Sequence, residues 1–169
     1  MRLLFLDIDG VLNAHEPLDP EVMCGTFHPE KVMLLNQVLR QTDAKIVLSS
    51  AWRYLVHRGE MNLNGLEWLL RSHGILAGRL HGITCKDSER KIVSWDGTYA
   101  SWVHGNERGK QIAEYLGNDR SIPYAVVDDL DLGISDCGHP FVQTDSAVGL
   151  RVEDAKKLVE SESIETRRN

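Results

Sequence analysis

Carboxylate and hydroxyl side chains follow directly after three short apolar runs of this sequence. In chain order they are Asp7 after LLFL, Ser49 after IVL, and Asp128 with Asp129 after YAVV. If the apolar runs are neighbouring parallel strands, their carboxyl ends meet at one edge of a sheet, where ligands bind in proteins of this kind. The sequence therefore predicts a site that combines several acids with a hydroxyl group.

The first acidic pair, in LLFLDIDGVLN, consists of Asp7 and Asp9, two carboxylates that repel each other at the end of a buried run. Gly10 permits a sharp turn directly after the pair. A hard cation such as Mg²⁺ would neutralise the charges, and Asp128 and Asp129 could complete its coordination from another strand. We therefore predict a Mg²⁺ site held by these four aspartates. The alternative is that the pair only ends a strand.

Strand-like and helix-like segments alternate along the chain. The candidate strands are Leu3–Leu6, Ile46–Leu48, Gly82–Thr84, Tyr124–Val127 and Phe141–Val142. The candidate helices are HPEKVMLLNQVLRQ, NGLEWLLRSHG, RGKQIAEYLG and VEDAKKLVE. Because parallel strands need long crossovers that pack as helices, this order predicts an α/β fold, a doubly wound parallel sheet with helices on both faces.

The length of 169 residues and the hydrophobic content of 42% indicate one domain, which we place at residues 1–160. The polar end of the chain, 161–169, is expected to fray. Residues 79–106 have no clear periodicity, which in a compact domain is more often a lid or a substrate-binding insertion than a structureless loop. The remaining gaps leave no room for a large separate cap domain.

Charge and cysteine content narrow the class of protein. The net charge of −6 argues against strong non-specific binding to nucleic acid. No apolar run approaches the length that spans a membrane. The three cysteines show no C-x-x-C spacing, which favours reduced thiols in a soluble, cytoplasmic protein. The oligomeric state stays open.

Four segments in chain order, FLDIDGVLN, IVLSSAWR, ERGKQIAEYL and VVDDLD, resemble the four sequence motifs of the haloacid dehalogenase (HAD) superfamily of phosphohydrolases. The resemblance extends from Leu3 to Asp131. The LSSAWR stretch, the RG-x-x-I helix and the FVQTDSAVGL tail look most like the HAD domains of RNA-repair proteins and polynucleotide phosphatases.

This resemblance implies a HAD-type, Rossmann-like fold and a Mg²⁺-dependent phosphatase. Asp7 would be the nucleophile that forms an aspartyl-phosphate. Asp9 would bind Mg²⁺ through its main-chain carbonyl, protonate the leaving oxygen and later activate water. The ion would lie between Asp7 and the phosphate and would also be held by Asp128 or Asp129.

The resemblance also implies groups that bind the phosphate. Ser49 would donate a hydrogen bond to a phosphoryl oxygen, and Lys110 would add positive charge. Arg108 lies in the same first helical turn, and the RNA-repair subgroup uses an arginine here, so both cations are candidates, with Lys110 favoured. Ser50 is a second candidate for substrate binding, with helix capping as its alternative.

Trp52 and Arg53 follow the second motif closely enough to contact a substrate, by stacking and by a bidentate guanidinium. The alternative is that Trp52 packs in the core and that Arg53 is solvated.

The expected substrate is a nucleotide or a nucleic-acid terminal phosphate, because a site without a large cap is open to large substrates. Small sugar phosphates and phosphoproteins are alternatives, as is a catalytically silent or regulatory phosphate-binding module. A signalling receiver domain is disfavoured because its lysine comes last in the chain, whereas Lys110 precedes the second acidic pair. No P-loop motif is present.

Overall fold

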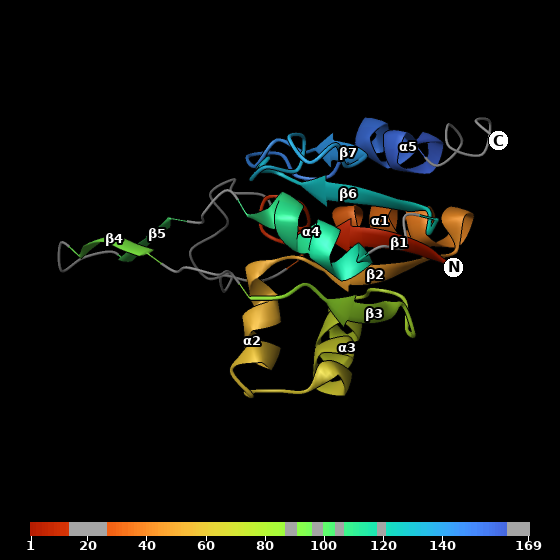
Figure 1. Ribbon diagram of the computed structural model, residues 1–169. Helices are drawn as coiled ribbons and strands as arrows, with labels where there is room; N and C mark the ends of the chain where they lie inside the picture. The colour runs from red at the N-terminus through yellow and green to blue at the C-terminus, as the bar shows by residue number, and fades with distance from the viewer. Residues whose placement is uncertain (14–26, 87–90, 96–99, 104–106, 118–120, 162–169) are drawn as a thin grey trace.

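A computed structural model describes residues 1–13, 27–86, 91–95, 100–103, 107–117 and 121–161, with backbone only for 91–95 and 100–103. Its centre is a five-stranded sheet in the order β3-β2-β1-β6-β7 (Figure 1). The strands are β1 (Arg2–Leu6), β2 (Ala44–Leu48), β3 (Leu80–Ile83), β6 (Tyr124–Asp128) and β7 (Phe141–Gln143). Every neighbouring pair is parallel, as the sequence predicts.

The strands are continuous apolar runs because helices bury both faces of the sheet. Leu4 and Leu6 of β1 belong to one core cluster, whereas Leu3 and Phe5 belong to the cluster on the opposite face. Side chains alternate between faces along a strand, so one strand contributes to both cores. The prediction of helices on both faces is confirmed.

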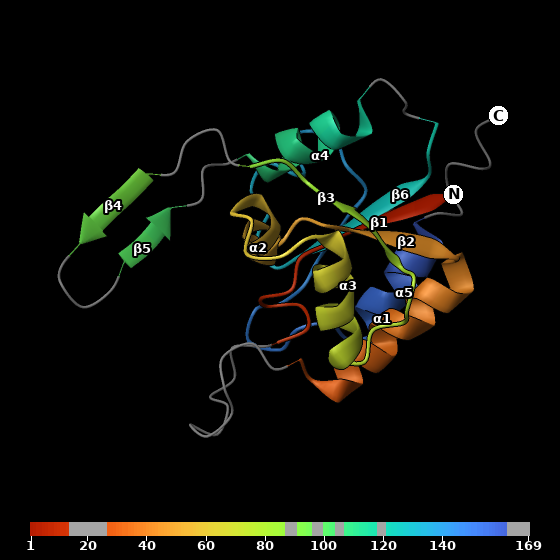
Figure 2. The ribbon, with the colours of Figure 1, turned by 90° about the horizontal axis from the view of Figure 1, so that it is seen from below.

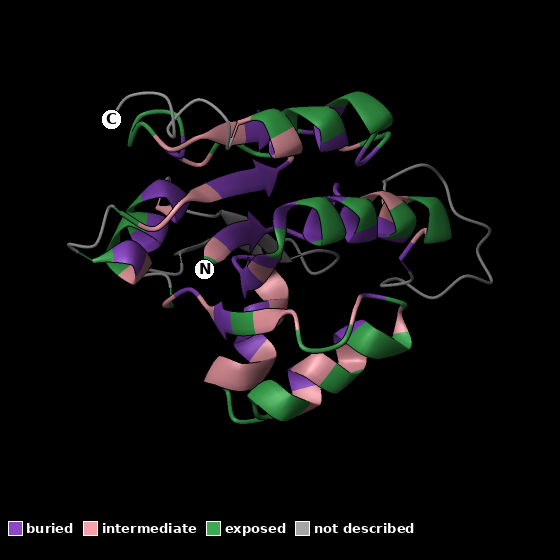
Figure 3. Cartoon of the chain, turned by 90° about the vertical axis from the view of Figure 1, so that its right-hand side faces the viewer, coloured by how far each residue is buried: buried purple, intermediate pink, exposed green. Residues whose placement is uncertain are grey.

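Three helices cover one face of the sheet, and one helix covers the other (Figure 2). The first group is α1 (Pro29–Thr42), α3 (Leu63–Ser72) and α5 (Val152–Glu160), and the opposite helix is α4 (Arg108–Leu116). The buried residues of these helices lie toward the sheet, and their exposed residues lie on the outer side (Figure 3). All four segments were predicted as helices.

A short helical segment after β2 was not predicted. It consists of a 3₁₀ turn, η1 (Ala51–Arg53), and one turn of α-helix, α2 (Tyr54–His57). Ser50 caps the 3₁₀ turn, since its hydroxyl accepts a hydrogen bond from the backbone N–H of Trp52 at 3.4 Å. This segment begins three residues after the last residue of β2.

The region 79–106 contains more regular structure than its sequence suggested. It begins with β3 and continues into an antiparallel hairpin of β4 (Lys91–Trp95) and β5 (Ala100–Val103). The hairpin forms a sheet of its own and extends away from the main sheet, on the side of its carboxyl ends (Figure 1). Its expected role as a lid stays a prediction, and residues 162–169 of the expected tail lie outside the described residues.

No large separate cap is present among the described residues. Within the same ranges, no helix has the length and apolar character needed to cross a membrane. Cys85 and Cys137 are free thiols, and Cys24 lies outside the described part of the chain.

Candidate active site

The parallel register places polar residues side by side where the strands end. β1 pairs in register with β2 and with β6 up to Leu6, so Asp7, Ser49 and Asp128 follow next to one another across three strands. Backbone bonds continue this row: the N–H of Asp7 donates to Val127 O at 3.0 Å, and the N–H of Ser49 donates to Leu6 O at 2.9 Å. The carboxyl ends of these three strands thus lie side by side, as the sequence predicts.

All three side chains belong to the sheet face that α4 covers. Asp7 is two residues after Phe5, and strand side chains two residues apart share a face. Phe5 packs in the core cluster that contains Ile112 of α4. The strand-end acids therefore lie under the N-terminal turn of α4 rather than toward α1 and α5.

Three carboxylates form a compact acidic cluster. Asp7, Asp128 and Asp129 each offer one oxygen, and these oxygens all lie within 4.8 Å of one another. Asp7 and Asp128 are buried, whereas Asp129 is partly exposed. Gly10 makes room for the cluster, because it has a φ of +77° and a Cβ at this position would collide with the Asp129 side chain.

Arg108 reaches this cluster from the first turn of α4. Its Nη1 donates to Oδ1 of Asp7 at 2.8 Å and also to Oδ2 of Asp128. The approach depends on Gly109, since a Cβ there would collide with the backbone of Gly133 in the loop after β6. Close contact between α4 and this loop thereby brings the guanidinium to the strand ends.

Burial and mutual repulsion perturb the acids. Burial raises the pKa of Asp7 well above its ordinary value, Arg108 opposes the rise, and the neighbouring carboxylates, Asp128 first among them, add to it. Burial also raises the pKa of Asp128, against the attraction of Arg108. The carboxylates favour the charge of Arg108 in return and raise its pKa. One guanidinium thus offsets only part of the negative charge.

The cluster fits a divalent cation. Carboxylate oxygens are the ligands that Mg²⁺ prefers, and a cation would stabilise the ionised form of Asp7, whose pKa is raised first by burial and then by the neighbouring carboxylates. A small pocket of about 120 Å³ opens at this point. It is lined by Asp7, Asp9, Ala51, Arg108, Asp128, Asp129 and Leu130.

A comparison with protein families agrees with this geometry. The family model described as the HAD domain in Swiss Army Knife RNA repair proteins matches residues 3–155. The chain belongs to this family. No curated protein and no solved structure matches it. Membership indicates a phosphatase-type hydrolase. HAD proteins are generally Mg²⁺-dependent, and the cluster of three aspartates is compatible with a bound Mg²⁺ ion.

The preference for Lys110 as the phosphate-facing cation needs correction. Lys110 is exposed and does not line the pocket of this HAD domain, whereas Arg108 is buried against the acids. Each helical residue advances by about 100°, so positions 108 and 110 point about 200° apart. Only one of them can face the strand ends, and the structure places Arg108 there.

Asp9 lies at the rim of the site. It lines the pocket but is not part of the three-carboxylate cluster. Asn13 holds it, since Nδ2 of Asn13 donates to Oδ1 of Asp9 at 2.7 Å and the N–H of Gly10 donates to Asn13 O at 3.0 Å. The sequence did not point to Asn13. The expected role of Asp9 in proton transfer stays a prediction.

Hydroxyl groups occupy two adjacent strand ends. Ser49 is fully buried, and among the described residues its hydroxyl has no hydrogen-bond partner. Thr84, which follows β3, is also fully buried, and its hydroxyl likewise finds no partner in the described part of the chain. The N–H of Thr84 donates to Leu48 O at 3.1 Å, which places it beside Ser49. Thr84 was missed because the predicted strand, Gly82–Thr84, included it, whereas β3 ends at Ile83.

Neither Trp52 nor Arg53 lines the pocket. Trp52 packs against the core with its ring centroid 5.3 Å from that of Phe27, which is the packing alternative. Arg53 is only 2% exposed, so the idea of a solvated Arg53 is wrong. Its N–H groups donate to acceptors within the protein. The structure therefore does not place Arg53 where it was expected to contact the substrate.

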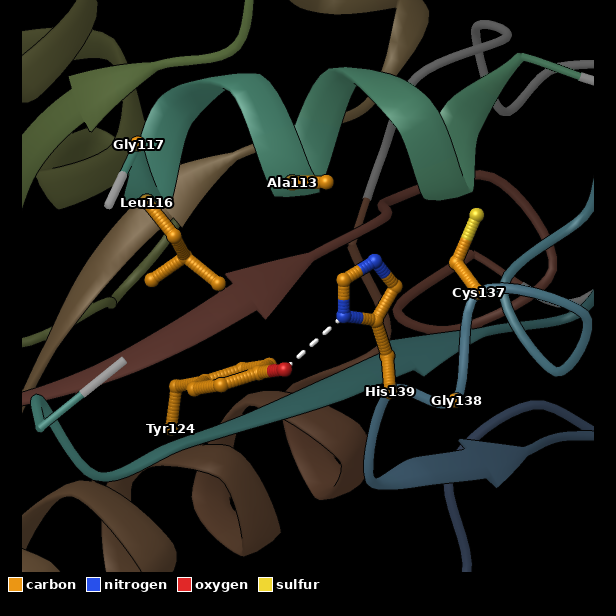
Figure 4. A pocket seen from close by; sticks show the side chains of 7 residues that line it. All are labelled: Ala113, Leu116, Gly117, Tyr124, Cys137, Gly138 and His139. Atoms are coloured by element: carbon orange, nitrogen blue, oxygen red, sulfur yellow. Dashed lines mark hydrogen bonds between the residues drawn. The ribbon is translucent and has the colours of Figure 1, made fainter. Parts of the chain in front are cut away.

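A second cavity lies beneath the C-terminal half of α4 and shares no lining residue with the acidic pocket (Figure 4). Its volume is about 200 Å³. Nε2 of His139 donates to Gly109 O at 2.7 Å, which leaves Nδ1 to accept from the Tyr124 hydroxyl at 2.8 Å. Because these polar groups bind each other and the main chain, the acidic pocket is the better candidate for chemistry.

Proposed function

We propose that this HAD domain is a Mg²⁺-dependent phosphomonoesterase that forms an aspartyl-phosphate on Asp7. The observation that carries the proposal is the cluster of Asp7, Asp128 and Asp129 at the ends of β1 and β6, with Arg108 bound to two of its members. A cation would offset the negative charge of this cluster, and a carboxylate needs positive charge nearby before it can approach a phosphate dianion.

Asp7, Asp128 and Asp129 would hold the Mg²⁺ ion, together with the main-chain carbonyl of Asp9. When bound, the ion supplies positive charge that offsets the carboxylates and polarises a phosphoryl oxygen. The remaining steps are assigned to side chains of this protein.

In the first step, an oxygen of the Asp7 carboxylate attacks phosphorus while the bond from phosphorus to the leaving oxygen breaks. Asp9 gives its proton to the leaving oxygen. Because Oδ1 of Asp9 already accepts a hydrogen bond from Asn13, we assign the transferred proton to Oδ2. The products of this step are the aspartyl-phosphate and the free alcohol.

In the second step, Asp9 takes a proton from a water molecule, which attacks phosphorus and breaks its bond to Asp7. Inorganic phosphate leaves, and Asp7 is a carboxylate again. Ser49 and Arg108 would donate hydrogen bonds to the phosphoryl oxygens in both steps. Arg108 has five N–H donors, so it can contact phosphate and still bind an aspartate.

We propose a nucleotide or a nucleic-acid terminal phosphate as the substrate. The family is described as a domain of RNA repair proteins, which supports this class. The pocket of about 120 Å³ has room for little more than the phosphoryl group, so the rest of the substrate would lie outside it. Exposed Leu130 at its rim offers an apolar contact for that part.

The test is phosphate release from 4-nitrophenyl phosphate and from 3′- and 5′-phosphorylated nucleotides, oligonucleotides and sugar phosphates, with Mg²⁺ or with EDTA. We expect turnover that EDTA abolishes and that Asp7→Asn removes. Equal phosphate release by the wild type and by Asp7→Asn would overturn the assignment of the nucleophile. Mg²⁺-dependent phosphate binding without any turnover would instead identify a silent phosphate-binding module.

A further inference from the structure

Arg53 is the largest of the fully buried side chains, and its donors connect three separate parts of the site. Nη1 donates to Ser49 O at 2.6 Å and to Ser50 O at 2.8 Å, in the turn after β2. Nε donates to Cys85 O at 3.2 Å, in the chain after β3. The guanidinium thus binds main-chain carbonyls in the two segments that carry the buried hydroxyl residues Ser49 and Thr84.

The third connection runs to α4. Nη2 of Arg53 donates to Oε1 of Gln111 at 3.3 Å. Gln111 is three residues after Arg108, so the two side chains lie on the same side of the helix. Gln111 is buried like Arg108. One contact therefore joins the turn that carries Ser49 to the helix that carries the cation of the acidic cluster.

We propose that Arg53 and Gln111 are positioning residues, which fix the distance between Arg108 on α4 and Ser49 after β2. This inference rests on the proposed function, because Arg108 and Ser49 are the groups that would hold the phosphoryl oxygens. Neither Arg53 nor Gln111 contacts the substrate in this scheme.

Two observations favour positioning over simple core packing. First, the acceptors of Nη1 are the carbonyls of Ser49 and Ser50 themselves, so Arg53 orients the peptide groups next to the Ser49 hydroxyl. Second, Arg53 is held in place from the side by Tyr54, whose ring centroid is 4.7 Å from the guanidinium carbon. A planar group with fixed donors on three segments sets their relative positions more tightly than apolar contacts do.

The test is a double-mutant cycle of Gln111→Leu and Arg108→Lys with 4-nitrophenyl phosphate and Mg²⁺. Gln111→Leu removes the acceptor for Arg53 with little change in volume, and Gln41→Leu, at an exposed position of α1, is the matched control. We expect Gln111→Leu to lower kcat by roughly tenfold, since small misplacements of catalytic groups are costly, with KM little changed. Gln41→Leu should leave both unchanged.

If Gln111 acts through Arg108, then Gln111→Leu should change kcat by less than about twofold once Arg108 is lysine. A residue that only supports the core would instead lower kcat by the same factor in both backgrounds, and that result would overturn the inference. So would an unchanged kcat in Gln111→Leu. Thermal melts of each variant identify any loss that comes from unfolding.

The inference and the proposed function can fail separately. If the wild type binds inorganic phosphate in the presence of Mg²⁺ but releases none from any substrate, hydrolysis is wrong, and the same cycle is then measured as phosphate affinity by calorimetry. Non-additive losses of affinity would still support positioning, and additive ones would refute it. A wild type without phosphate release or phosphate binding would overturn both.

Discussion

Asp7→Asn should make the Mg²⁺-free protein more stable while it removes activity. The reason is that Asp7 is a buried carboxylate among other carboxylates, so its charge disfavours folding until a cation is present. An asparagine keeps an oxygen that can accept the hydrogen bond from Arg108. The substitution therefore removes the repulsion between the carboxylates and keeps the hydrogen bond from Arg108.

The balance of charges sets the direction of the effect. At an effective dielectric constant of about 20, unit charges no more than 4.8 Å apart repel by at least about 3.5 kcal/mol, so Asp128 and Asp129 together repel Asp7 by at least about 7 kcal/mol. The attraction of Arg108, at 2.8 Å, is about 6 kcal/mol on the same basis. Arg108 also shares its charge with Asp128, and burial adds a further penalty for the charge on Asp7.

These opposing terms leave a small net penalty on the charged form. We expect Asp7→Asn to raise the free energy of unfolding by about 1–2 kcal/mol, the usual gain from relieving an active-site strain. In a domain of this size that corresponds to a rise in Tm of about 2–4 °C per kcal/mol. Differential scanning calorimetry in EDTA measures the shift.

The pH dependence follows from the raised pKa of Asp7. The folded protein binds this proton more tightly than the unfolded chain, so the wild type loses stability as pH rises above 3.8, the ordinary pKa, until Asp7 has ionised in the folded state. Asparagine does not titrate. The excess Tm of Asp7→Asn should therefore be small near pH 4 and larger at about pH 7.5.

Magnesium should reverse the order of the two proteins. A ligand at a hundred times its Kd stabilises the folded state by about 2.7 kcal/mol, which the wild type should gain and Asp7→Asn should gain only in part. A fall of 3–5 kcal/mol in the stability of Mg²⁺-free Asp7→Asn is the loss expected when one member of a buried ion pair is removed. That result would show that the attraction of Arg108 dominates and would refute the reasoning.

Three further predictions concern single side chains. Arg108→Ala should lower kcat/KM by at least about 10²-fold, as for other groups that stabilise developing charge, whereas Lys110→Ala should change it by less than about twofold in the same phosphate-release assay. Asn13→Ala should lower kcat by about tenfold, because Asp9 loses the donor at 2.7 Å that orients it; an unchanged kcat would contradict the importance of this contact. Thr84→Val should leave Tm unchanged or raise it by a few degrees, because it removes a buried hydroxyl without a partner among the described residues; a marked fall in Tm would show that Thr84 is hydrogen-bonded in solution.

The strand-end acids could be predicted because two simple rules act together. Buried parallel strands are continuous apolar runs, and side chains directly after such runs meet at one edge. Both rules depend only on the local sequence around Asp7, Ser49 and Asp128. The fold class followed from the same alternation of runs and helices.

The choice between Arg108 and Lys110 depended on helix phase, and the sequence contained that signal. Ile112 and Leu116 are apolar and four residues apart, which indicates that both face inward, because a helix repeats its face about every four residues. Arg108 precedes Ile112 by four residues and shares its face, whereas Lys110 does not. The family resemblance alone could not separate them, because both cations lie in the first turn.

Other residues carried no such signal. Arginine is almost never fully buried unless it is paired, so nothing in the sequence suggested the position of Arg53. Its acceptors are main-chain carbonyls and Gln111. They come together only in the folded protein, where the segments after β2 and β3 lie next to α4. Asn13 and Thr84 are polar residues without a characteristic spacing. Their contacts arise from the tertiary fold.

The buried acids and the buried Arg53 affect the stability of the protein in opposite directions. Asp7 and Asp128 are buried charges whose raised pKa values show that the fold alone disfavours their ionised forms. Arg53, in contrast, is satisfied by several acceptors and holds the surrounding segments together. Under the positioning role proposed above, this support fixes the helix that carries Arg108 relative to the turn that carries Ser49. Substitutions at the acids should thus stabilise the Mg²⁺-free protein, and substitutions at Arg53 should destabilise it.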